Sequence, residues 1–198
     1  MLTMRWRRPL DSRPLLTASM TPINQTILTL HSQLTSISMA DIFGQIYGWF
    51  QSLFGQDLSY YLWGYDPATE GYTNPNIYNH VGLIAIIVAL VLVLVYYYII
   101  NHPRFCKWWS WLLTLILNGL IGLFVGYGIV ASKYINGFIP QQLMYQFDAD
   151  GNVVAYLIGY QHCWGFGIAN MIVCTMFFIL FSFAFKWWSS NAKHVPFL

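Results

Sequence analysis

The sequence predicts an all-α membrane protein with three transmembrane helices, an N-terminal amphipathic helix at the membrane interface, and a small β-hairpin between the second and third spans. Three observations lead to this fold class. Of the 198 residues, 57% are hydrophobic and 8% are charged, whereas a soluble domain carries about 25% charged residues. Three stretches each contain about 20 predominantly apolar residues, the length that crosses a bilayer. Two of these stretches have the tetrapeptide KWWS at one end.

Residues 1–38 differ from the rest of the chain because they are rich in Ser and Thr and contain four arginines. They lack the compact apolar core of a secretory signal. They share the Arg-rich, Ser-rich, acid-poor composition of a transit peptide, although Pro9 and Pro14 would interrupt a helix. We expect either a disordered extension or a start-site artefact, with translation beginning at Met39.

Residues 39–64 carry large apolar side chains at helical spacing, with polar and small residues on the other side, and therefore predict an amphipathic helix. The segment is too short and too polar to span a membrane. Two placements remain open: the lipid headgroup boundary, or the surface of the protein's own helix bundle. Residues 65–80 are rich in Pro, Gly and Asn and predict an outer loop.

The predicted transmembrane domain, residues 81–188, contains spans at 81–100, 108–131 and 163–185. All three are expected to be helices because a lone lipid-facing strand would leave its backbone amides unpaired. The connection at 101–107 is so short that the first two spans must form an antiparallel pair.

The segment 132–162 joins the second and third spans and contains a turn signal, Asp148 to Asn152, between two short apolar stretches. This pattern predicts a β-hairpin outside the bilayer. A competing interpretation starts the third helix as early as Val153. The DADGN string is similar to a calcium loop, but no acidic ligand follows Asp150.

Basic residues in short loops stay on the cytoplasmic side. They occur in 101–107 and in the tail at 189–198, whereas 39–80 contains no Lys or Arg. We therefore expect a bacterial inner-membrane protein with its N-terminal side out and its C-terminus in the cytoplasm. Native arginines in residues 1–38 would have to cross the membrane, which favours the start-site artefact.

The two KWWS copies precede the second span and follow the third, so they lie at the same membrane face. Indole rings prefer the headgroup level, and an adjacent lysine favours the cytoplasmic leaflet. The expected membrane anchors are Lys107, Trp108, Trp109, Trp111, Lys186, Trp187 and Trp188.

Small and polar residues inside the spans predict a helix-packing seam or a polar path. They are Asn118, Gly122, Gly126, Gly167, Asn170 and Thr175. Counting the helical rise from the two lysines places Asn118 level with Thr175, and Asn170 near Gly122. One interpretation is a hydrogen bond between Asn118 and Thr175 beside a glycine seam. The other has these side chains lining a path in an oligomer.

The sequence contains no catalytic signature, no expected cofactor and no cysteine spacing for zinc. The formal charge of +2 is too small to suggest nucleic acid. The expected partners are the lipid bilayer and either a membrane protein or a second copy of the chain. The apolar tail Val195, Pro196, Phe197 and Leu198 is expected either to dock into a partner or to be a frayed terminus.

These observations favour a non-enzymatic interaction or assembly component of a membrane complex. The alternative is an oligomeric pore former, such as a holin-like or defence-type protein that permeabilises the membrane. A membrane enzyme is the third hypothesis, and it would require His80 and His162 to come together on the outer side.

Overall fold

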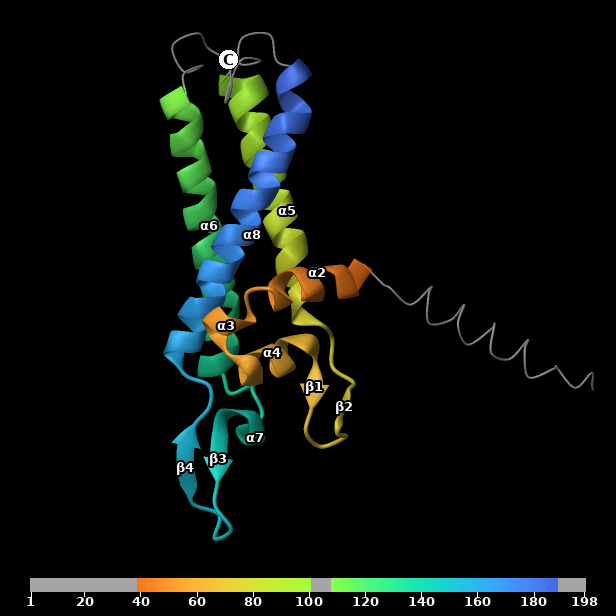
Figure 1. The fold of residues 1–198 in the computed structure, drawn as a ribbon, viewed down its shortest axis with the longest axis vertical. Helices are drawn as coiled ribbons and strands as arrows, with labels where there is room; N and C mark the ends of the chain where they lie inside the picture. The colour runs from red at the N-terminus through yellow and green to blue at the C-terminus, as the bar shows by residue number, and fades with distance from the viewer. Residues whose placement is uncertain (1–38, 101–107, 189–198) are drawn as a thin grey trace, which may run out of the picture. The chain divides into compact units, whose positions relative to one another are not determined.

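The computed structural model describes residues 39–100 and 108–188 (Figure 1). Within these ranges, three helices are long and apolar enough to cross a membrane. They are α5 (Ile77–Leu94), which continues into the π-helical turn η1 (Val95–Ile100), α6 (Trp108–Ile135) and α8 (Tyr160–Phe185). The prediction of three helices that could span a membrane is therefore confirmed. The interpretations placed on residues 1–38, on Lys107 and on the tail from Val195 to Leu198 lie outside the described residues.

Each long helix extends beyond its predicted apolar stretch at the same end of the bundle. Helix α5 begins at Ile77 instead of Val81, α6 continues to Ile135, and α8 begins at Tyr160. Hydropathy detects only the part of a helix that must lie in hydrocarbon. An α-helix forms the hydrogen bonds of its backbone within itself, so it can continue beyond that part into the polar boundary. This end is called the hairpin end below, because both strand pairs lie there (Figure 1).

The N-terminal segment forms three short helices where the sequence predicted one. They are α2 (Met39–Gly48), α3 (Gln51–Phe54) and α4 (Gln56–Trp63). Gly55 separates α3 from α4 with a φ of 82°, a conformation that favours glycine, and Gly64 ends α4 with a φ of 89°. Figure 1 shows α2 lying across the long helices near the hairpin end.

The apolar side of this segment packs on the protein's own bundle, which was one of the two open placements. Phe43, Tyr47, Phe54 and Leu58 belong to the same buried cluster as residues of α5, α6 and α8. Aromatic rings make much of this cluster: Tyr47 stacks on Tyr78 at 5.3 Å between centroids. The three short helices are therefore an integral part of the helical core.

The predicted hairpin is present. Strands β3 (Tyr145–Phe147) and β4 (Val153–Tyr156) pair antiparallel, and the four-residue helix α7 (Gln141–Met144) precedes them. The Asp148 carboxylate accepts hydrogen bonds from the backbone N–H groups of Asp150 (3.0 Å) and Asn152 (2.7 Å), which closes the turn. The interpretation that started the third helix at Val153 is wrong, because β4 occupies that position.

A second strand pair occurs where the sequence predicted only a loop. Strands β1 (Tyr65–Asp66) and β2 (Gly71–Tyr72) pair antiparallel, and the Tyr65 and Tyr72 rings meet at 5.5 Å between centroids. Two residues per strand are too few to produce an alternating pattern, so this pair left no periodic signal in the sequence.

Candidate functional site

The glycines of α6 form a close helix contact in the core, and that contact is made with α8 of the same chain. A Cβ atom on Gly122 would lie 2.6 Å from the Cys174 Sγ, and one on Gly126 would lie 2.7 Å from the Asn170 Cβ. On the α8 side, a Cβ on Gly167 would lie 3.0 Å from the Leu123 carbonyl oxygen. These small residues let the two backbones approach, as the sequence predicted, and they do so within one chain.

Asn170 is the polar centre of the seam and is fully buried. Its Nδ2 donates to the Gly122 carbonyl oxygen at 2.6 Å, and its Oδ1 accepts from the Tyr47 hydroxyl at 2.5 Å. One side chain thus joins α2, α6 and α8. Both of its polar atoms have partners, so its burial leaves no unsatisfied group.

Tyr47 is a member of this site that the sequence analysis missed. Depth counts along the spans do not extend to the N-terminal segment, so nothing linked Tyr47 to Asn170. Its position on the apolar side of the amphipathic pattern was the only signal, and that signal predicted burial alone. Desolvation raises the pKa of Tyr47 well above its ordinary value, so the hydroxyl stays protonated and acts as a donor.

The hydrogen bond expected between Asn118 and Thr175 is not formed. The Asn118 Nδ2 donates instead to the Cys174 carbonyl oxygen at 2.9 Å. Thr175 donates to the carbonyl oxygen of Met171, one turn earlier in its own helix, at 2.8 Å. A threonine in a helix readily donates to a carbonyl oxygen one turn earlier in the same helix. Asn118 and Thr175 can therefore lie at the same depth without a hydrogen bond between their side chains. The Asn118 Oδ1 is buried without a hydrogen-bond partner.

The predicted membrane anchors fall into two groups. Trp108, Trp109 and Trp187 expose their indole rings, with Trp187 79% exposed. Lys186 lies with its ammonium 5.4 Å from the centre of the Phe183 ring. Lys186, Trp187 and Trp188 together form the short 3₁₀ turn η2 (Lys186–Trp188), which follows α8.

Trp111 differs from the expectation for an anchor. It is only 9% exposed, and its Nε1 donates to the Ser182 Oγ at 3.2 Å. Trp111 follows the exposed pair by less than one turn and falls on the face of α6 that contacts α8. It is therefore an interhelical packing residue.

The hairpin β3–β4 carries exposed apolar side chains next to Tyr145, which is partly buried against the core. The Tyr145 ring contacts the rings of Tyr156 at 5.3 Å and Phe147 at 6.3 Å between centroids. Val153 pairs with Phe147 across the strands. These four residues are called the hairpin cluster below. Phe147, Val153 and Tyr156 are exposed, and Tyr156 reaches 74%.

His162 has a structural role at the start of α8, where its Nδ1 accepts a hydrogen bond from the Gly159 backbone N–H at 3.0 Å. Among the residues that the structure describes, no three His, Cys, Asp or Glu side chains are grouped so that they could hold a metal ion. Comparison of the sequence with protein-family models, with curated proteins and with solved structures gives no match.

Proposed function

We propose that the protein is a non-enzymatic interaction or assembly component of a membrane complex, and that the hairpin cluster binds its partner outside the bilayer. The observation that carries this proposal is the exposure of Phe147, Val153 and Tyr156 on a two-stranded hairpin. Apolar side chains on a water-exposed hairpin gain about 25 cal/mol for each Å² that a partner covers.

The backbone of the hairpin offers a second means of recognition. Among the described residues, strands β3 and β4 pair only with each other, so each has an outer edge that no other described strand pairs with. Such an edge can accept a further strand from a partner. A two-stranded hairpin is marginally stable alone in water, which gives partner binding a further stabilising effect.

The orientation belongs to the same proposal: the hairpin end faces the outside of a bacterial inner membrane. Counting about 1.5 Å per residue from Lys186 places Asn170 about 24 Å along α8. A hydrocarbon core of about 30 Å then puts Tyr47, which contacts Asn170, close to the outer boundary. The α2–α4 segment would therefore lie at headgroup level while it packs on the bundle. Trp49, which is exposed beside α2, suits that level.

A pore former receives less support from these contacts. The side-chain N–H groups of Asn118 and Asn170 donate to carbonyl oxygens within one chain, and the glycine seam that could join two copies is occupied by α8. The exposed face of α6 presents apolar side chains, among them Leu113, Leu120 and Phe124. These suit lipid better than a water-filled path.

A photo-crosslinking amino acid at Val154 tests the proposal, because Val154 is 64% exposed and lies beside the hairpin cluster. Illumination of intact membranes should give one discrete adduct, and the additional substitution Tyr156→Ser should abolish it. A crosslinker at Ala68, which is exposed in the turn between β1 and β2, is the matched control and should give no such adduct. An adduct of twice the 22.9 kDa chain mass would identify a second copy as the partner.

No adduct at Val154, or an adduct that persists in Tyr156→Ser, would contradict the role of the hairpin cluster. A dye-leakage measurement after induced expression separates the two functions. An interaction component leaves the membrane sealed, whereas leakage would favour the pore former.

A further inference from the structure

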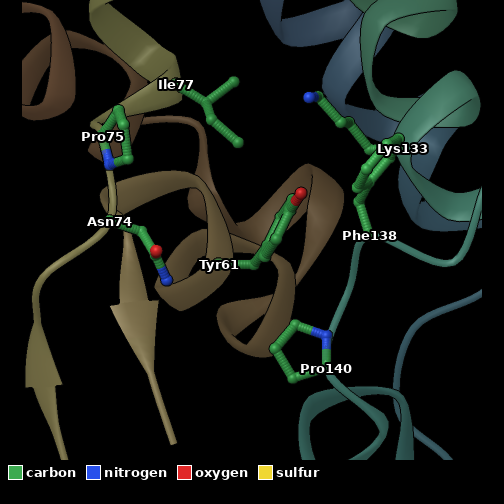
Figure 2. A pocket seen from close by; sticks show the side chains of 7 residues that line it. All are labelled: Tyr61, Asn74, Pro75, Ile77, Lys133, Phe138 and Pro140. Carbon is green, nitrogen blue, oxygen red and sulfur yellow. The ribbon is translucent and has the colours of Figure 1, made fainter. Parts of the chain in front are cut away.

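A cavity of about 240 Å³ lies at the hairpin end, between α4, the segment that enters α5 and the segment that leaves α6 (Figure 2). It is lined by Tyr61, Asn74, Pro75, Ile77, Lys133, Phe138 and Pro140. No carboxylate lines it, and Lys133 supplies a positive charge. The cavity is therefore polar on one part of its wall and apolar on the rest.

The polar groups of this cavity have almost no partners among the residues that the structure describes. The Lys133 ammonium lies 4.7 Å from the centre of the Phe138 ring, and within the described residues this is its only partner. The Tyr61 hydroxyl and the Asn74 side-chain amide form no hydrogen bond with any described residue. Figure 2 shows the Tyr61 hydroxyl directed toward the part of the cavity where the Lys133 ammonium lies.

These groups are donors suited to an anion. An ammonium group offers three N–H donors and no acceptor, and a phenol offers one O–H donor. Partial burial raises the pKa of Tyr61, so its hydroxyl remains protonated. Hydrogen bonds from such donors to a charged oxygen are shorter and stronger than those between neutral groups.

The depth of Lys133 indicates where the anion comes from. Counting about 1.5 Å per residue from Trp108, at the opposite membrane boundary, places Lys133 about 37 Å along α6. A hydrocarbon core of about 30 Å within a bilayer of about 40–45 Å puts this position in the headgroup layer. Phosphate groups of lipids are concentrated at that level.

We propose that this cavity binds the phosphate group of an anionic phospholipid of the outer-facing leaflet. The Lys133 ammonium and the Tyr61 hydroxyl bind the phosphate oxygens, and the Asn74 amide contacts the polar headgroup at the rim. The apolar walls at Ile77 and Phe138 face the glycerol end of the lipid. The volume accommodates a headgroup and leaves the acyl chains in the bilayer.

Lys133 also lies in the last turn of α6, where a positive charge stabilises the helix dipole. That structural role involves no preference among lipids, so the test must measure lipid binding. The full chain is purified in a mild detergent, and lipid retention is measured by native mass spectrometry. Phosphatidylglycerol serves as the anionic lipid and phosphatidylcholine as the zwitterionic one.

The chain should retain one phosphatidylglycerol in preference to phosphatidylcholine. Lys133→Gln should weaken this binding about tenfold or more, because it removes the charged donor. Tyr61→Phe, which keeps the ring and removes only the hydroxyl, should weaken it by a smaller factor of about three to ten. Lys133→Arg keeps the charge and should retain the lipid preference. Tyr72→Phe removes an exposed hydroxyl at the same end of the bundle but outside the cavity, and it is the matched control, which should leave retention unchanged.

Several results would overturn the proposal. They are unchanged retention in both Lys133→Gln and Tyr61→Phe, a loss in Tyr72→Phe equal to that in Tyr61→Phe, and equal retention of the two lipids. Soluble glycerol phosphate provides the last arm of the experiment. If it displaces phosphatidylglycerol at equal concentration, the cavity recognises phosphate from solution and the assignment to a lipid fails. If Lys133→Gln does not fold, Lys133→Arg and Tyr61→Phe still test the proposal.

Discussion

The substitution Gly165→Ala tests the packing of the N-terminal helices on the spans. Gly165 lies near the start of α8, directly against the end of α3. A Cβ atom at this position would lie 1.9 Å from the Leu53 carbonyl oxygen. Carbon and oxygen atoms in contact normally stay about 3.3 Å apart, so the Leu53 backbone would have to retreat by about 1.4 Å. A backbone atom cannot rotate away as a flexible side chain can.

The retreat would also disturb Phe54, which is fully buried and packs edge-on against Phe166 at 5.3 Å. Overpacking a well-packed core costs about 1–3 kcal/mol, and we expect the upper part of that range because the obstacle is backbone. For a chain of this size, about 3 kcal/mol corresponds to a fall in Tm of about 6–12 °C.

Thermal unfolding in detergent, followed by tryptophan fluorescence, would measure this change. Gly128→Ala is the matched control: it is the same substitution in a neighbouring span, and a Cβ there would meet nothing within 4 Å. Gly128→Ala should leave the Tm unchanged or raise it slightly. Equal Tm values for Gly165→Ala and the unmodified chain, or equal losses in both variants, would refute the packing of α3 on α8.

Two further predictions concern hydrogen bonds. Tyr47→Phe should destabilise the chain by about 0.5–2 kcal/mol and Asn170→Ala by about 2–4 kcal/mol, because the latter leaves a buried hydroxyl without an acceptor. In a double-mutant cycle, the stability lost in the double variant should be about 1 kcal/mol smaller than the sum of the two single losses. A double loss equal to that sum would contradict the direct hydrogen bond between Tyr47 and Asn170. At the hairpin, backbone N–H groups, chiefly that of Asn152, lower the pKa of Asp148 below 3.8. The carboxylate therefore stabilises the turn above its unfolded-state pKa, and this stabilisation is lost as the pH falls through the lower folded value. Asp148→Ala should increase amide hydrogen exchange at Asn152 at neutral pH, and unchanged exchange would argue against the turn.

The spans and the hairpin could be predicted because their causes are local. Each span required a stretch of about 20 predominantly apolar residues, and the turn at Asp148 to Asn152 required only its own residue types. The depth count along the two helices placed Asn170 near the level of Gly122, and the Asn170 side chain does donate a hydrogen bond to the Gly122 carbonyl oxygen. The same count paired Asn118 with Thr175 and failed, because depth does not specify which way a side chain points around its helix.

The composition and the apolar runs by themselves determined which stretches of the chain are long and apolar enough to cross a membrane, and the turn signal determined where along the chain the hairpin lies. These features follow from transfer of side chains between water and lipid, which depends on sequence alone. Only the tertiary structure decided that the amphipathic segment breaks at Gly55 and packs on the bundle, that Tyr47 reaches Asn170, and that Trp111 faces inward. Each of these depends on which surfaces meet, and a pattern of apolar positions specifies that a face is buried without specifying its partner.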